Sequence, residues 1–395
     1  DRFDVASTTF NNQWNEMYSE VLNDFDLMIK NTGDLPNYQA VARLMKAYYM
    51  QYMTDLWGEV PYTEAFAGQE GNLNPSYDPQ TQIYTDLIAE VEEAIAQIDK
   101  DPSAAVIADE DFIYGGDLDK WEKFGNTLLL RLYIRLSESN EQVARDGITD
   151  ILTSGAPLID SEADDAVFVF GTRAETNENP LSQQDFQRSG DYGASETIVN
   201  LMQGLNDPRI PVYFRQDQNG MYSGVPNGNP DDLPTDGTGT TIVSPIGSFF
   251  VQEASPVFLL TYYDRLFIEA EAAIRGWVNA ASAPQLYDDA VAAAINKYGL
   301  SAGNYLDPGQ PANYNDAADK LELLYTQRYI SLFARGPEAY AEWRRTDVPS
   351  LTAPADAISV NQIPVRLPYS SDEQNSNSQF PGSVDIFNTP VSWDQ

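Results

Sequence analysis

The chain has 395 residues, of which 42% are hydrophobic, so it is long enough to bury a substantial core. It carries 60 acidic and 23 basic residues, a formal net charge of −37, and such a field repels nucleic acids and anionic lipid head groups. Cysteine and histidine are both absent, which excludes disulfides, thiol nucleophiles, zinc–thiolate sites and the commonest neutral-pH proton shuttle. Because the sequence begins at Asp1 with no basic and apolar leader, we expect a processed form.

The N-terminal part of the chain is predicted to be helical, because its apolar residues recur every three or four positions. The expected helices cover about 8–30, 38–56, 79–98, 119–138 and 141–154. Between the second and third helices, "WGEVPYTEAF" contains a helix stop. Gly58 can adopt the left-handed conformation that ends a helix, and Pro61 prevents the helix from resuming. We interpret Trp57 and this turn as structural.

Residues 155–258 differ in composition from the helical part. The stretch "VFVFGT" alternates as a short strand does, and Ser195 is placed to cap a helix over 194–204. The remainder is rich in Gly, Pro, Asn and Asp. Long loops inside an ordered domain are often functional, because the scaffold presents them for contact. We therefore expect a functional loop-rich insertion, with a disordered insertion as the alternative.

Helical periodicity returns after the insertion, and it predicts helices over about 259–278, 284–298, 315–335 and 337–346. In the stretch 270–300, small residues occur where a tetratricopeptide helix pair needs close helix approach. A regular array would repeat about every 34 residues, whereas these helix pairs are irregular. We therefore expect about four degenerate tetratricopeptide-type units.

The predicted fold class is mainly α, with a loop-rich region that contains short strands. The helical scaffold covers about 8–154 and 259–346, and the C-terminal stretch 347–395, rich in Pro, Ser and Asn, is predicted to be irregular and to wrap the helices. We expect one domain over residues 1–395.

Six segments, in the expected order between residues 43 and 377, resemble motifs of the SusD/RagB family of outer-membrane lipoproteins of Bacteroidetes. They are "AYYMQYMTDLWGEVPYTEAF", "YDPQTQIYTDLIAEVEEAIAQI", "WEKFGNTLLLRLYIRLSE", "YYDRLFIEAEAAIRGW", "YTQRYISLFARGPEAYAEWRRTDVP" and "IPVRLPYSSDEQNSN". The first matches the family's helix end followed by a Gly-x-Val-Pro turn. One departure is that the lipid-bearing Cys of the family is missing, and we attribute this to where the given sequence starts.

The resemblance implies a non-enzymatic glycan-binding protein on the cell surface. Members of this family are lipid-anchored to the outer membrane, capture an oligosaccharide or polysaccharide, and pass it to a SusC-like TonB-dependent transporter. The acidic composition favours a neutral glycan over a sulfated or uronate one. Contact with a membrane is expected only through an N-terminal lipid anchor that lies outside this sequence.

Glycan contacts are expected from aromatic residues, because sugars stack on aromatic rings while polar groups bond their rims. Two stretches supply both kinds of residue: the one after the Gly58 turn and the insertion. The candidate ligand-binding residues are Phe66, Tyr77, Phe186, Arg188, Tyr192, Tyr213, Asn219 and Tyr222. For each aromatic residue alone, use in the core or as a loop anchor is the alternative.

Arginines stand out in a chain so short of cations. Arg side chains form bidentate pairs with carboxylates, so we interpret them as buried ion pairs with residues such as Glu271, Glu338 or Glu342. Recognition of carbohydrate hydroxyls is the alternative. The arginines concerned are Arg131, Arg135, Arg344, Arg345 and Arg366.

No catalytic residue and no metal ligand are predicted, and no cofactor is expected. The stretches "DPQ", "DQNG" and "NPDDLPTDG" could offer oxygen ligands to a structural calcium ion, but none fits the twelve-residue calcium loop. Two functional alternatives stay open. One is a helical glycoside hydrolase that uses paired carboxylates, and the other is a peptide-binding member of the same family.

Overall fold

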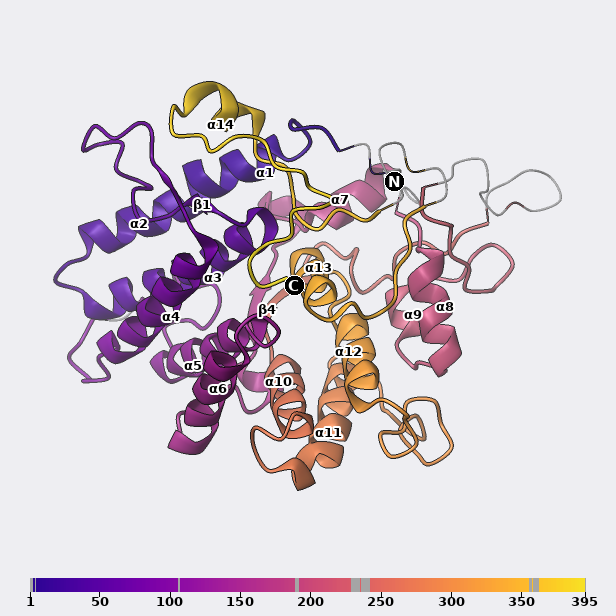
Figure 1. Ribbon diagram of the computed structural model, residues 1–395. Coiled ribbons are helices and arrows are strands. Elements are labelled where there is room, and N and C mark those ends of the chain that lie inside the picture. Colours follow the sequence, from indigo (N-terminus) through magenta and orange to yellow (C-terminus); the bar gives the residue numbers. More distant parts are fainter. Residues whose placement is uncertain are drawn as a thin grey trace. The chain divides into compact units, whose positions relative to one another are not determined.

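The computed structural model is mainly helical (Figure 1). It describes residues 3, 5–105, 107–188, 192–228, 235, 242–354, 357 and 362–394. By internal contacts the chain divides into two compact units, which we describe separately. The N-terminal unit comprises Asp4–Ile159, Tyr340–Thr346 and Gln362–Gln395, and the central unit comprises Asp1–Phe3, Asp160–Ala339 and Asp347–Asn361. The single-domain expectation stays a prediction.

The N-terminal unit is a run of helices in which each packs on the next. Its helices are α1 (Asn11–Glu16), α2 (Leu22–Asn31), α3 (Pro36–Trp57), α4 (Gln80–Gln97), α5 (Leu118–Arg135), α6 (Glu141–Ser154) and α14 (Ser371–Ser376). A π-helical turn, Met17–Val21, joins α1 to α2, so the helix predicted over 8–30 exists but is interrupted. As predicted, α3 packs on two sides, since it contacts both α2 and α4.

The turn after α3 has the structure that the sequence indicates. Gly58 has φ 80° and ends the helix, and its N–H donates to the Thr54 carbonyl at 2.8 Å. The chain then forms the short strand β1 (Val60–Pro61), which pairs antiparallel with β2 (Tyr77–Asp78). Residues 62–76 therefore form a loop whose two ends meet at this strand pair. Helix α4 begins directly after β2.

The central unit contains the insertion and the second set of helices: α7 (Pro180–Gln187), α8 (Glu196–Leu205), α9 (Ile210–Tyr213), α10 (Tyr262–Ile274), α11 (Ala283–Asn296) and α12 (Lys320–Ser331). Its strands β3 (Ala166–Val169) and β4 (Pro256–Leu260) pair antiparallel. The predicted start of α10 at residue 259 is wrong, because Thr261 and Asp264 form a capping box that starts the helix at Tyr262 and leaves β4 before it. α7 and α9 were not predicted.

Helix α13 (Gly336–Thr346) contributes residues to both units. Within the N-terminal unit, residues of the C-terminal segment form hydrogen bonds with α3. The Trp57 indole N–H donates to the Pro368 carbonyl at 2.8 Å, and the Trp393 indole N–H donates to Asp55 Oδ1 at 2.9 Å. The short helix α14 inside this segment was not predicted.

Buried arginines stabilise the N-terminal unit, and the ion-pair interpretation is confirmed for three of them. Arg366 lies 3.3 Å from Glu59 Oε2. Arg135 and Arg345 both contact the buried carboxylate of Glu342, at 3.4 Å and 2.5 Å. The Arg344 guanidinium instead donates to the Asp55 backbone carbonyl at 2.6 Å. Arg131 donates to Gln51 at 2.9 Å.

Candidate functional site

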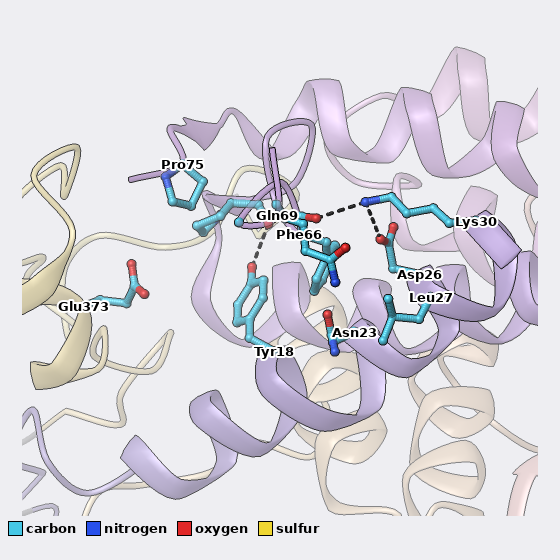
Figure 2. A pocket seen from close by; sticks show the side chains of 12 residues that line it. Tyr18, Asn23, Asp26, Leu27, Lys30, Phe66, Gln69, Pro75 and Glu373 are labelled. Carbon is cyan, nitrogen blue, oxygen red and sulfur yellow. Dashed lines mark hydrogen bonds and ion pairs between the residues drawn. The ribbon is translucent and has the colours of Figure 1, made fainter. Parts of the chain in front are cut away.

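A cavity of about 390 Å³ lies in the N-terminal unit (Figure 2). Three segments line it: the π-turn with α2, the stretch that follows β1, and α14. Its lining residues are Tyr18, Asn23, Asp26, Leu27, Lys30, Pro61, Ala65, Phe66, Gly68, Gln69, Pro75 and Glu373. The wall thus combines aromatic and aliphatic surface with two amides and three charged side chains, the composition of a small-molecule site.

Phe66 is held in the wall of this cavity in an unusual backbone conformation. It has φ 62°, in the left-handed region that a residue with a bulky side chain rarely occupies. The Lys30 ammonium donates to the Phe66 carbonyl at 3.0 Å, and the Lys46 ammonium lies 4.8 Å from the centre of its ring. Such strain occurs preferentially at functional sites.

Both lysines are oriented by one buried carboxylate. Asp26 lies 2.9 Å from the Lys30 ammonium and 2.6 Å from the Lys46 ammonium. Because Asp26 is almost fully buried, these pairs are less screened by solvent than pairs on the surface. Asp26 therefore positions Phe66 through the two lysines.

Tyr18 forms the second aromatic surface of the cavity. Its hydroxyl donates to the Pro61 carbonyl at 2.7 Å, and its ring centre lies 5.9 Å from that of Phe66 with an interplanar angle of 31°. Burial, and then the negative charges of Glu373 and Asp78, raise the pKa of Tyr18 well above its ordinary value. Tyr18 is consequently a neutral phenol at any physiological pH.

A group of aromatic rings supports Tyr18 from behind. The Trp14 ring centre lies 5.1 Å from that of Tyr18 and 5.3 Å from that of Trp57. Tyr77 stacks on Trp14 with a centre separation of 6.4 Å, and its hydroxyl donates to Glu373 Oε2 at 2.9 Å. Burial and the charge of Glu373 raise the pKa of Tyr77. Tyr77 thus orients a cavity residue.

The loop that borders the cavity is held by its own hydrogen bonds. Glu64 accepts from the Ser76 N–H at 2.9 Å and from the Asn72 amide at 3.3 Å. Asn377 donates to the Pro75 carbonyl at 2.9 Å, which ties the loop to the end of α14. These hydrogen bonds hold the loop in the cavity wall.

The structure brings the two N-terminal candidates together and places the others in the central unit. Phe66 lines the cavity and Tyr77 supports it from the side. In the central unit Phe186 and Tyr192 are strongly exposed, at 73% and 49%, and Tyr222 is half-buried. Arg188 and Asn219 are exposed as well.

Tyr213 has to be removed from the candidates. It is fully buried, stacks on Phe333 with ring centres 4.4 Å apart, and donates to the Ile330 carbonyl at 3.1 Å. The aromatic cluster of the central unit, which includes Phe214 and Phe250, surrounds it. The alternative interpretation, a core residue, is therefore the correct one for Tyr213.

Sequence reasoning missed most of the cavity. Tyr18, Asp26 and Lys30 were not singled out. A usable signal existed, because Tyr18 lies four residues after Trp14 and so shares its helix face. Glu373 lies in the last of the six segments that resemble the family, but nothing local in the sequence places it at the cavity, since it is brought there from the far end of the chain.

In two of the three stretches considered for calcium, the aspartate carboxylate accepts hydrogen bonds from backbone N–H groups. Asp78 Oδ2 accepts from the backbone N–H groups of Tyr62 and Thr63, and Asp217 Oδ1 accepts from those of Asn219 and Met221. Apart from Thr235, the stretch 229–237 lies outside the described residues. Where the structure describes side chains, no three acidic ones gather as a metal site would require. The cofactor expectation stays a prediction.

The fold and the site together define a mainly helical protein with a cavity lined by aromatic and polar side chains. The chain belongs to the SusD-like family, whose model is described as "Starch-binding associating with outer membrane" and matches residues 1–370. The predicted family and fold class are therefore confirmed; the tetratricopeptide-like pairing stays a prediction. Within the described part of the chain, no helix has both the length and the apolar character needed to cross a membrane.

Several solved structures are similar to this chain over nearly its whole length. One described as a chitin-binding protein is 26% identical, covers 100% of this chain and 89% of its own, and has a TM-score of 0.84. A chitin-binding SusD homologue from Flavobacterium johnsoniae is 25% identical, with coverages of 97% and 86% and a TM-score of 0.81. A SusD homologue from Bacteroides uniformis is 25% identical, with coverages of 96% and 86% and a TM-score of 0.80. A comparison with curated protein sequences gives no match.

Proposed function

We propose that this protein binds a neutral oligosaccharide or polysaccharide without cleaving it, at the cavity formed by Tyr18 and Phe66. It acts at the outer membrane, anchored by an N-terminal lipid and facing outward, and it passes the glycan to a SusC-like TonB-dependent transporter. The observation that carries the proposal is the pair of aromatic rings in one wall, with amide and charged groups around them.

The chemistry of the cavity suits a sugar. The C–H faces of a pyranose pack on aromatic rings, while its hydroxyls bond to amides and carboxylates around the ring. Asn23 and Gln69 supply the amides, and Glu373 supplies a carboxylate. Two carboxylates, Asp26 and Glu70, balance the charges of Lys30 and Lys46, so these lysines offer little attraction to an anionic glycan.

The comparisons support the same class of ligand. Two of the similar structures are described as chitin-binding, and the family description names starch. Chitin and starch are both built of uncharged pyranose rings, which fits a chain with a net charge of −37. Chitin oligosaccharides and maltooligosaccharides are therefore the first ligands to test.

The test is calorimetric titration of the protein with both oligosaccharide series and with polygalacturonate as an anionic control. Tyr18→Ala and Phe66→Ala should each weaken binding about tenfold, which corresponds to losing about 1.4 kcal/mol of ring contact. Phe112→Ala is the matched control, because Phe112 is 74% exposed and does not line the cavity.

The same mixtures should be assayed for released reducing sugar. Binding without release supports the proposal, whereas release would show a hydrolase. If no glycan binds, the proposal fails and peptides become the next ligands to test. Transfer is tested separately, by co-purification of the full-length lipoprotein with a co-expressed SusC-like transporter.

A further inference from the structure

Helix α14 is too short to be stable alone, yet it brings a carboxylate to the cavity. It has six residues, Ser371–Ser376, and its Glu373 lines the cavity beside Tyr18 (Figure 2). An isolated helix of this length is unstable in water, because the cost of nucleation exceeds the gain from so few hydrogen bonds. The position of Glu373 therefore depends on the contacts that α14 makes with other segments.

On one side, α14 is bonded to the loop that borders the cavity. Glu373 accepts from the Tyr77 hydroxyl at 2.9 Å and from the Asn377 amide at 3.0 Å, in both cases through Oε2. Its Oε1 accepts no hydrogen bond from the residues that the structure describes, so it is available to a hydroxyl of a ligand. Just after the helix, the Ser378 N–H donates to Asn74 Oδ1 at 2.7 Å.

On the other side, one asparagine of α1 bonds to the start of α14. Oδ1 of Asn11 accepts from the Ser370 hydroxyl and the Ser371 N–H, both at 3.0 Å, and its Nδ2 donates to the Ser371 hydroxyl at 2.7 Å. One turn further along α1, the Asn15 amide donates to Asp372 Oδ2 at 2.8 Å. Both ends of the Asn11 amide are thus used on a segment 360 residues away, and all of these residues belong to the N-terminal unit.

Helix α1 also supports the aromatic wall of the cavity. Its Trp14 packs on Tyr18 with ring centres 5.1 Å apart, and α1 continues directly into the π-turn that carries Tyr18. Asn11 lies in the first turn of this helix. Its hydrogen bonds therefore connect the helix that holds the ring of Tyr18 to the helix that holds the carboxylate of Glu373.

We propose that Asn11 is a positioning residue of the glycan site, which holds Glu373 where one pyranose ring contacts both its carboxylate and Tyr18. The sugar packs on the ring of Tyr18, while Oε1 of Glu373 accepts a hydrogen bond from one of its hydroxyls. Asn11 does not itself line the cavity, so it acts through α14. This inference rests on the proposed function, because it assumes that the ligand is a neutral glycan.

The arrangement also couples the cavity to residues 7–15. The Ser7 carbonyl accepts from the Ser371 N–H at 3.2 Å, so this segment and α14 are ordered together. The structure describes all of residues 7–15, and none of them lines the cavity. Because coupling between two sites is reciprocal, a glycan that bonds to Glu373 should stabilise residues 7–15 against local opening.

The experiment titrates wild type, Asn11→Ala and Asn12→Ala with chitotetraose and with maltotetraose by calorimetry. Asn12 is the matched control, because it is exposed, is adjacent to Asn11, and makes no hydrogen bond to the described residues of α14. Asn11→Ala should weaken binding about tenfold, the loss of one hydrogen bond to a charged group, and Asn12→Ala less than about twofold. Melting temperatures from circular dichroism confirm that each variant is folded.

A double-mutant cycle separates positioning from a general effect on stability. Glu373→Ala removes the carboxylate, and Asn11→Ala should then cost no further affinity, because Asn11 acts through that group. An equal loss from Asn11→Ala with and without Glu373 would overturn the proposal. If Asn11→Ala does not fold, Asn15→Ala replaces it: this variant loses one exposed hydrogen bond to α14 and should weaken binding by a smaller factor.

Hydrogen exchange gives a readout that does not depend on affinity. Without ligand, Asn11→Ala should speed amide exchange in residues 371–377, and Asn12→Ala should not. Saturating glycan should slow exchange in residues 7–15 of the wild type but not of Asn11→Ala. Wild-type affinity in Asn11→Ala would overturn this inference and leave the proposed function intact. Absence of glycan binding by the wild type would overturn both.

Discussion

The carboxylate of Asp26 lies 2.6 Å from the ammonium of Lys46, and that ammonium lies over the ring of Phe66. The buried carboxylate on α2 thus orients the ammonium group that packs on Phe66, in the loop after β1. The relationship makes Asp26 a positioning residue, because it lines the cavity and also holds both lysines that contact Phe66.

Replacement of Asp26 by Asn should remove both ion pairs and allow Phe66 to leave its strained conformation. We expect glycan affinity to fall about fivefold, or about 1 kcal/mol, because the ring must then be ordered on binding. Calorimetric titration measures this. Asp24→Asn is the matched control, since Asp24 is an exposed residue of the same helix. Unchanged affinity in Asp26→Asn would show that the lysines are merely structural.

Gly58→Ala should destabilise the N-terminal unit by about 3 kcal/mol, because its backbone, at φ 80° and ψ −118°, excludes side chains. A Cβ there would also lie 2.7 Å from Nη2 of Arg366. Urea unfolding monitored by circular dichroism would measure the change. Gly33→Ala is the control, since nothing lies within 4 Å of a Cβ at that position. An equal decrease in the free energy of unfolding in Gly58→Ala and Gly33→Ala would contradict the prediction.

Trp393→Ala should reduce the free energy of unfolding by about 3–5 kcal/mol, as expected for emptying a large buried site. The indole packs 4.7 Å from the Arg344 guanidinium and 5.4 Å from that of Arg135, and it donates to Asp55. Trp393→Phe keeps an aromatic ring but loses the hydrogen bond and part of the indole volume, so the free energy of unfolding should fall by less than in Trp393→Ala. A near-neutral Trp393→Ala would mean that the C-terminal segment does not stabilise the helices.

Asp165 in the central unit predicts a pH dependence. Its carboxylate pairs with Lys297 at 2.5 Å, yet burial outweighs this pairing and raises the pKa of Asp165 from 3.8 to about 6. Because the folded state has the higher pKa, this group stabilises the fold most below pH 3.8. That contribution declines as the pH rises through about 6.

The measurement is the difference in free energy of unfolding between wild type and Asp165→Asn, by denaturant titration across this pH range. Asn resembles the protonated acid, which the folded state favours below about pH 6, so the stability of the wild type relative to the variant should fall by up to about 3 kcal/mol as the pH rises between the two pKa values. Asp307→Asn, an exposed change in the same unit, should show no such trend. A constant difference for Asp165→Asn would contradict the raised pKa.

Much of the helical scaffold was predictable because apolar periodicity and caps are local properties. Helices α3, α4, α5 and α6 lie where the periodicity places them, and Asn140 caps α6 through its side chain. The short helices α7, α9 and α14 were missed because they have too few turns to show a period. The interruption at Met17–Val21 was also hidden, because a single π-turn rotates the helix face but barely changes the spacing of apolar residues in the sequence.

The sequence by itself determined the family, the mainly helical class, the helix stop at Gly58 and the acidic character of the surface. Only the tertiary structure decided which aromatic residues are available to a ligand. Tyr213 and Phe186 come from similar polar stretches, yet one is buried and the other exposed, because exposure depends on which distant segments pack against each ring. For the same reason Glu373 reaches the cavity beside Tyr18: hydrogen bonds from Tyr77 and Asn377 hold its carboxylate there.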